Sequence, residues 1–76
     1  MNAFEVRDYV EEQGYAHFTD DLGYKITINL DEGFILYGSA IIIFEELIVR
    51  DWDEIQFTNG DNDCAFIDCK NWKVIE

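Results

Sequence analysis

Several residue types on which small domains often depend are scarce in this chain. Its 76 residues include no proline, five glycines, two cysteines and one histidine. No stretch has the composition of a linker, and a chain of this length is expected to form a single domain over residues 1–76. Two cysteines are too few for a disulfide scaffold. If Cys64 and Cys69 share one strand, their odd spacing places them on opposite faces, where they do not bond to each other.

The scarcity of histidine, serine and cysteine removes the usual residues of catalysis and metal binding. His17 and Ser39 are the only residues of their kinds, and nothing in the sequence places them together as base and nucleophile. Two cysteines and one histidine fall short of a zinc site. The run Asp61-Asn62-Asp63 lacks the alternating ligands and the closing glutamate of a calcium loop. We therefore expect no enzyme, no catalytic or metal-binding residues and no cofactor.

Long apolar runs are also missing. The longest, residues 40–44, is far shorter than the roughly 20 residues that span a bilayer. Residues 1–5 lack the basic and apolar regions of a signal peptide. We therefore expect a cytoplasmic protein, in the host cytoplasm if it is viral, with no membrane partner.

Negative charge is what the chain has in excess. Seventeen Asp and Glu residues face five Lys and Arg residues, for a formal net charge of −12. Charge of this density opposes compaction, repels nucleic acid and anionic membranes, and attracts basic surfaces. Hydrophobic residues still make up 49% of the chain and aromatic residues 16%, which is too many for a disordered acidic tail. The acids therefore belong to a folded domain.

The N-terminal segment 3–13 is predicted to be a helix. Asn2 and Glu5 have the spacing of a capping box, and Gly14 is a typical helix terminator. The apolar stripe of this helix consists of Val6, Tyr9 and Val10.

From residue 24 onward the hydrophobic pattern is that of strands. Residues 24–30 alternate between apolar and polar, as a half-buried strand does. Residues 34–37 and 40–44 are nearly continuous apolar runs. Helical spacing is present there too, but three consecutive isoleucines favour one long strand with a bend at Gly38. Further strands are expected over residues 47–50, 55–58, 64–69 and 72–75, with a turn at 45–46 and a hairpin turn over 59–63.

The predicted fold is α+β, with a short N-terminal helix followed by about five antiparallel strands. These form a small SH3-like barrel or a strongly curved sheet. His17 is expected in a loop between the helix and the sheet. Segments 34–37 and 41–44 carry apolar side chains on both faces, more than one sheet and one helix cover. We therefore expect a homodimer or an apolar contact with another partner.

Two motifs within residues 24–75 resemble those of the Sm-like family, whose members begin with a short helix and continue as a bent five-stranded barrel. Gly33-x4-Gly38 followed by residues 40–42 is similar to the first motif, and residues 67–75 are similar to the second. The resemblance implies a small barrel and assembly through strand edges into a ring or a dimer.

This chain departs from the Sm-like pattern at the positions that help hold RNA in that family. Phe44 stands where the family usually carries an aspartate, and Asp68-Cys69 stands where it carries a basic residue and a glycine. Because an aspartate repels phosphate, RNA binding does not carry over to this chain.

The acids gather at predicted turns and on the outer face of the predicted helix. Helix neighbours three or four residues apart lie about 5–6 Å from each other, comparable with the spacing of phosphates along a nucleic-acid strand. Such carboxylates present a negative row to a groove built for a phosphate backbone. The predicted partner-binding residues are Glu5, Asp8, Glu11 and Glu12 on the helix, Asp51, Asp53, Glu54, Asp61 and Asp63 at turns, and Trp52 as an aromatic anchor.

Two functions from different classes remain open at this point. The first is an acidic nucleic-acid mimic, an inhibitor that occupies the basic groove of a DNA- or RNA-binding protein without itself binding nucleic acid, as phage anti-restriction or anti-CRISPR proteins do. The second is an Sm-like or SH3-like oligomeric interaction module whose acidity only aids solubility. The mimic predicts a salt-sensitive complex, and the module predicts a salt-resistant oligomer.

Overall fold

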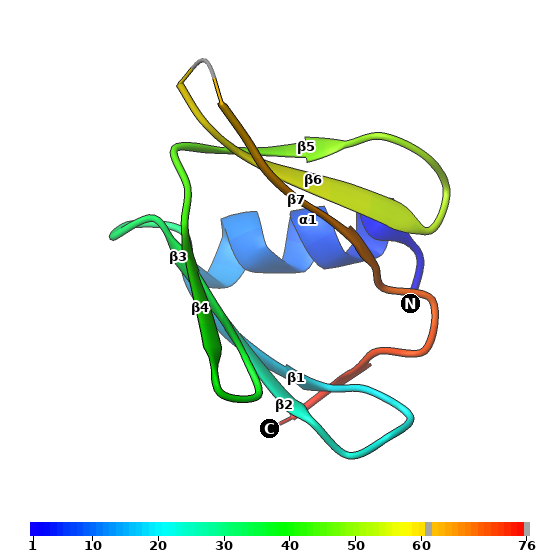
Figure 1. The fold of residues 1–76 in the computed structure, drawn as a ribbon. Helices are drawn as coiled ribbons and strands as arrows, with labels where there is room; N and C mark the ends of the chain where they lie inside the picture. The colour runs from blue at the N-terminus through cyan, green and yellow to red at the C-terminus, as the bar shows by residue number, and fades with distance from the viewer. Residues whose placement is uncertain (61, 76) are drawn as a thin grey trace.

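The computed structural model of the chain describes residues 1–60 and 62–75, and the side chains of these residues except 62–64. Within this part of the chain, one helix and eight strands form a small α+β domain with two antiparallel sheets. Helix α1 runs between the two sheets (Figure 1). The α+β class with an N-terminal helix is thus confirmed. Of the two expected arrangements, the closed barrel is wrong, because the described strands divide into two sheets, while the strongly curved sheet stays a prediction. The described strands number eight, where about five were expected.

Helix α1 (Ala3–Gln13) begins and ends where the sequence predicts. The Glu5 N–H donates to Asn2 Oδ1 at 2.8 Å, and the Asn2 N–H donates to Glu5 Oε1 at 3.0 Å, which completes the capping box. At the other end, Gly14 adopts a φ of 74° and donates its N–H to the Val10 carbonyl. The buried face of the helix consists of Ala3, Val6 and Val10.

The larger sheet has the strand order β4-β3-β2-β1-β8. Strands β1 to β4 form a meander of antiparallel neighbours, and β8 returns from the C-terminal part of the chain to pair with β1. These strands are β1 (Tyr15–Thr19), β2 (Lys25–Asn29), β3 (Phe34–Tyr37), β4 (Ala40–Ile43) and β8 (Lys73–Val74).

The smaller sheet has the strand order β5-β6-β7. Its strands are β5 (Glu46–Val49), β6 (Glu54–Asn59) and β7 (Asn62–Asp68). Asn59 pairs with Asn62 across the β6–β7 connection, as the predicted hairpin requires, while Asp61 lies outside the described residues. Strand β5 already includes Glu46, which the sequence assigned to a turn.

Two local predictions were wrong. Residues 15–19 form strand β1 instead of a loop, and His17 pairs there with Thr27 of β2, with Nδ1 2.9 Å from Thr27 Oγ1. The segments on either side of Gly38 form two antiparallel strands in place of one bent strand. Tyr37 lies opposite Ala40, so the two residues between them make a tight hairpin turn, with φ of 61° at Gly38.

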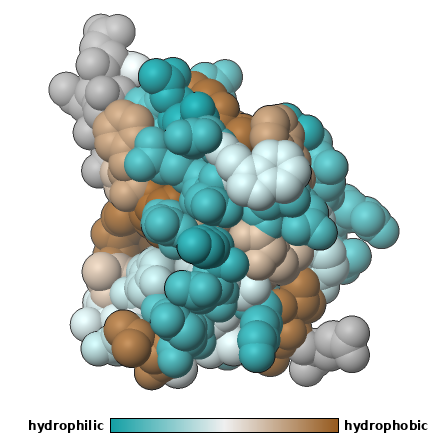
Figure 2. All heavy atoms as spheres, turned by 90° about the vertical axis from the view of Figure 1, so that its right-hand side faces the viewer, coloured by the Kyte–Doolittle hydropathy of each residue, from teal (hydrophilic) through white to brown (hydrophobic). Residues whose placement is uncertain are grey.

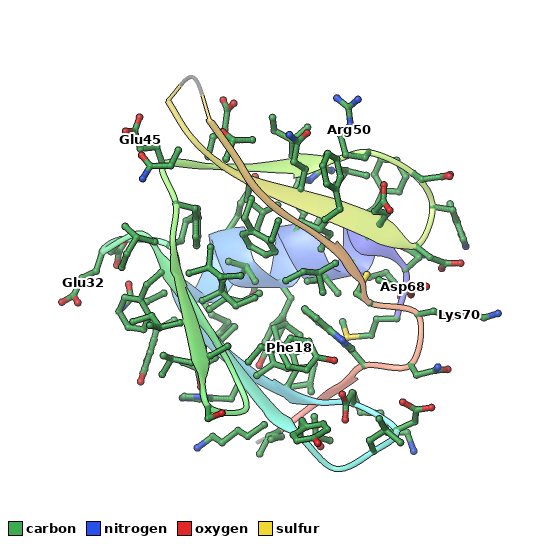
Figure 3. The ribbon with its side chains drawn as sticks, viewed as in Figure 1. Phe18, Glu32, Glu45, Arg50, Asp68 and Lys70 are labelled. Carbon is green, nitrogen blue, oxygen red and sulfur yellow. The ribbon has the colours of Figure 1, made fainter. Side chains whose placement is uncertain are left out.

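The hydrophobic core lies between the two sheets and the helix. The rings of Phe18 and Trp72 lie 5.3 Å apart and those of Phe44 and Phe57 lie 4.9 Å apart, measured between centroids. Phe18 points into this interior (Figure 3). Full burial of each large apolar side chain contributes about 1.5–3 kcal/mol. Fully buried members from the two sheets are Phe18, Ile26, Ile28, Ile35, Ile55 and Phe57.

Two turn glycines provide a matched test of this packing. Gly23 and Gly33 both have positive φ, at 87° and 75°. A Cβ at Gly23 meets nothing within 4 Å, whereas a Cβ at Gly33 clashes with the Phe44 carbonyl oxygen. Gly23→Ala is expected to lower the free energy of unfolding by about 1–2 kcal/mol through backbone strain alone. Gly33→Ala is expected to lower it by a further ~1–3 kcal/mol. Urea unfolding measures both, and equal losses would contradict the packing at Gly33.

Candidate acidic interaction surface

Helix α1 presents a row of carboxylates on its outer side. Glu5, Asp8, Glu11 and Glu12 are all exposed, and the opposite side of the helix is fixed in the core by its three buried residues. The packing of the buried residues, and not the charge of the acids, therefore directs these four side chains outward. Each of these acids has another three or four positions along the helix, and such like-charge neighbours destabilise a helix by about 0.2–0.5 kcal/mol per pair.

The position of Glu11 and Glu12 also opposes the helix dipole. Both lie in the last turn of α1, which contains no basic residue. Acids are favourable at the positive N-terminal end of a helix, where Glu5 lies, and unfavourable at the negative C-terminal end, by about 0.3–1 kcal/mol each. Helix stability therefore does not account for Glu11 and Glu12.

One cation offsets this row in part. Arg7 forms an ion pair with Asp8, with Arg7 Nη2 3.0 Å from Asp8 Oδ1. Both side chains are well exposed, and exposed pairs of this kind contribute at most about 1 kcal/mol. The Arg7 guanidinium also lies over the Phe4 ring, 5.3 Å from its centroid.

The loop between β5 and β6 lies against the N-terminal end of the helix. The Ala3 N–H donates to the Trp52 carbonyl oxygen at 2.7 Å, and the rings of Trp52 and Phe4 lie 5.9 Å apart. Trp52 is 62% exposed and Phe4 is 42% exposed. This contact brings two groups of predicted site residues together, the helix acids and the acids of residues 51–54.

Backbone hydrogen bonds give this loop a defined shape. The Glu54 carbonyl accepts the N–H of Arg50 and of Asp51, and Asp51 Oδ1 accepts the Trp52 N–H at 2.7 Å. The Asp53 carbonyl accepts the Cys69 N–H at 2.8 Å. Trp52 is thus presented on a fixed turn. The Arg50 side chain extends outward from the end of β5 (Figure 3).

The sequence did not identify Phe4, Arg7 or Asp68 as part of this surface. Phe4 lies outside the apolar stripe of the helix. An aromatic residue on the outer side of a helix was the one sequence signal that could have identified this surface. Asp68 lies directly opposite Glu54 in the β6–β7 ladder. Like charges in such a pair destabilise a sheet, so this is a further place where the acids work against the fold.

Two predicted site residues do not join this group. Asp63 pairs with Thr58, four residues along β6 from Glu54, which places its backbone roughly 13 Å away along the strand. The side chain of Asp63 and all of Asp61 lie outside the described residues. The name acidic surface is used below for Glu5, Asp8, Glu11 and Glu12 along the outer side of the helix, for Asp51 and Asp53 beside the aromatic pair Trp52 and Phe4, and for the pair Glu54 and Asp68 at the end of the smaller sheet.

Figure 2 shows the side of the molecule that lies on the right in Figure 1, where the β5–β6 loop and the start of the helix are found. Hydrophilic residues form a continuous band down the centre of this side, with paler and apolar patches on either side of it.

A second feature is an open depression at the edge of the larger sheet, with a volume of about 650 Å³. It combines the N-terminal ammonium and two lysines with two aspartates, so it favours neither sign of charge. Its ammonium is already engaged, donating to the Lys70 and Trp72 carbonyls at 3.1 Å. The residues that line it are Met1, Thr19, Asp20, Asp21, Lys70, Asn71, Trp72 and Lys73.

The polar groups behind this depression are bonded to each other. Asp20 accepts the Tyr37 hydroxyl at 2.6 Å and the backbone N–H groups of Leu22 and Tyr24. The Tyr37 bond is the main reason that the pKa of Asp20 is lowered. The indole N–H of Trp72 is the exception, since it is buried and makes no hydrogen bond to the described residues, although the Trp72 and Tyr37 rings lie 6.1 Å apart. The bonds between Asp20, Tyr37 and the β1–β2 turn stabilise the fold.

The remaining chemical groups give no further site in the part of the chain that the structure describes. No three His, Cys, Asp or Glu side chains there are grouped so that they could hold a metal ion. Burial raises the pKa of the Cys69 thiol to about 11, which keeps it protonated. Over the same residues, no helix has the length and apolar character to cross a membrane. No family model, curated protein or solved structure matches this chain.

Tyr37 gives a pH-dependent test of the Asp20 network. Burial, and then the bond to Asp20, raise the pKa of Tyr37 from 10.0 to about 12. Because the folded state holds this proton more tightly than the unfolded state, the contribution to stability is complete below about pH 10 and is lost as the pH rises towards 12. Tyrosinate absorbance should show an ionisation near pH 12 that Tyr37→Phe removes. An unchanged titration in this variant would contradict the network.

Proposed function

We propose that this protein is an acidic nucleic-acid mimic, which binds the basic groove of a DNA- or RNA-binding protein and keeps nucleic acid out of it. The observation that carries the proposal is that acids occupy positions where they oppose the fold. Glu11 and Glu12 lie at the negative end of the helix, and Glu54 lies opposite Asp68. Solubility alone requires only charges of both signs at positions where they do not destabilise the fold. Acids at destabilising positions therefore favour a binding role.

The aromatic pair supports the same proposal. An exposed ring beside carboxylates offers the two features of an unpaired nucleotide, a flat face and a negative charge. Grooves for single-stranded nucleic acid combine a basic track with aromatic side chains on which bases stack. Trp52 and Phe4 would contact such aromatic side chains while the carboxylates contact the basic track. The acidic surface would then block the groove by charge and by shape.

The proposed role is binding without catalysis. Long-range attraction between the acidic surface and a basic groove speeds association and weakens with added salt. Inhibitors of restriction enzymes or of CRISPR effectors are the class in which we propose that this protein acts. A second proposal, an oligomeric interaction module, is favoured by one observation, the exposure of the apolar side chains of Ile41 and Ile43 on β4, and the two proposals are compatible.

The direct experiment captures the partner and then competes for it. The tagged protein is incubated with a lysate of its source cells, washed at low and moderate salt, and eluted with duplex DNA or with single-stranded RNA. The proposal predicts a nucleic-acid-binding protein that is released both by salt and by one of the nucleic acids. Bound proteins that resist both treatments would overturn it.

Neutralising the helix row tests which acids matter. The variant Glu5→Gln/Asp8→Asn/Glu11→Gln/Glu12→Gln removes charge while keeping side-chain size, so association with the captured partner should slow by about tenfold or more at low salt. Stopped-flow or surface binding kinetics measure the rate. The control, Asp31→Asn/Glu32→Gln in the β2–β3 turn, removes two charges and should leave it nearly unchanged. An equal effect per charge removed in the two variants would show that only net charge matters.

Trp52 is expected to be the main apolar anchor. Trp52→Ala should weaken binding of the captured partner by about 2 kcal/mol or more, roughly 30-fold. Its effect on stability should be below about 1 kcal/mol, because the side chain is mostly exposed. Leu22→Ala, which removes a 77% exposed apolar side chain from the turn between β1 and β2, is the control. Unchanged affinity after Trp52→Ala would remove Trp52 from the proposed interface.

A further inference from the structure

The outer face of the larger sheet carries several exposed apolar side chains. The inward residues of β1 to β4 fill the core, so the alternate residues point away from it. The ladder places Tyr15, Asn29, Phe34 and Ile43 in one outward row, and His17, Thr27, Leu36 and Ile41 in the next. The two residues from β2 are polar, and Thr27 is buried beneath its neighbours. Ile41 is 60% exposed and Tyr15 is 53% exposed. These eight residues are called the outer sheet face below.

This face also lacks negative charge. None of the outward positions of β1 to β4, all of which the structure describes, is Asp or Glu, although the chain has 17 of them. The charges that flank the face are unequally placed. Lys25 and Lys73 lie opposite Thr19 at one end. Glu32, in the turn between β2 and β3, lies at the other end and extends away from the body (Figure 3).

We propose that the outer sheet face binds the same face of a second copy of this chain. A basic partner would find its complement on the acidic surface and not here. The lysines that flank the outer sheet face favour a partner with an apolar face and with acids beside that face. A second copy of this chain has both, since Glu32 lies at one end of its own outer sheet face. Two chains that each carry a charge of −12 repel each other least when their acid-free faces meet.

The flanking charges select the orientation of the pair. Two copies that pack their sheets face to face about a two-fold axis have two possible arrangements. In the first, the lysine end of one copy lies over the lysine end of the other. In the second, the lysine end of each copy lies over the Glu32 end of the other. Only the second places Lys25 of one copy near Glu32 of the other. The two aspartates at the lysine end are directed elsewhere, since Asp20 bonds Tyr37 and Asp21 lies 3.4 Å from the Asn71 amide.

The size of the face sets the expected strength. Five strands about 4.8 Å apart and five residues at about 3.3 Å each give a face of roughly 24 by 17 Å. That footprint is smaller than the ~800 Å² that each partner buries in a standard interface. The dimer should therefore be weak, with a dissociation constant of about micromolar or above. The acidic surface of α1 lies on the other side of this sheet, so this proposal does not depend on the proposed nucleic-acid mimicry.

Sedimentation velocity over a range of protein concentrations tests the proposal. The wild-type chain should shift from the monomer mass of 8.9 kDa to twice that mass as concentration rises. Ile41→Asp should weaken the dimer at least tenfold, because it buries a charge in the interface. The matched control is Phe66→Asp, at a half-exposed aromatic residue on the other sheet, and it should leave the dimer intact. Circular dichroism melts confirm that both variants fold.

A charge swap tests the orientation. Lys25→Glu and Glu32→Lys should each weaken the dimer, and the double variant should restore it, because the two charges are exchanged across the interface. A chain that stays monomeric at every concentration overturns the proposal, as does a dimer that Ile41→Asp leaves intact or that Phe66→Asp abolishes. A double variant no better than the singles would overturn the selected orientation.

Discussion

The packing of helix α1 between the two sheets is the contact on which the rest of the structure depends. The described sheets share no strand ladder, and α1 contacts both of them, through β1 and β5. Its inner side is made of Ala3, Val6 and Val10, all fully buried. An acid at any of these positions would be buried without a partner, at a cost of several kcal/mol. The outer side has no such constraint, and it is there that the chain carries its carboxylates. The same packing brings residue 52 to the start of the helix.

Charge is separated in this small domain more sharply than its composition requires. Acids occupy the outer side of the helix, the β5–β6 loop, both ends of the smaller sheet and the turns at both ends of the larger sheet, while the outer sheet face has none. A chain that needed only solubility would spread both signs over its surface. The separation instead leaves two surfaces with different chemistry, and we propose a basic partner for the first and a second copy of this chain for the other. The two surfaces lie on different sides of the larger sheet, so occupying one leaves the other open.

Local features of the fold were predictable from the sequence, and pairing between distant segments was not. The helix and both its ends follow from Asn2, Glu5 and Gly14, whose partners are within four residues. The sequence predicted an interruption of the strand at Gly38. Glycine is favoured both in a bulge and in a hairpin turn, and only the pairing of Tyr37 with Ala40 shows that this one is a hairpin turn. Strand β1 was missed because His17 and Thr19 make its outward side polar. For the site, exposure of the helix acids follows from their periodicity, whereas the contact of Trp52 with Phe4 joins residues 48 positions apart and has no local signal.

Carboxylate footprinting of the complex tests the central claim most directly. The protein, alone and bound to its captured partner, is labelled with a carbodiimide and an amine, and the modified acids are located by mass spectrometry. Binding is expected to protect Glu5, Asp8, Glu11 and Glu12 and the acids of residues 51–54, while Asp31 and Glu32 stay reactive. Protection of Asp31 and Glu32 with the helix acids still reactive would contradict the central claim, because the partner would then be bound by a surface other than the acidic one.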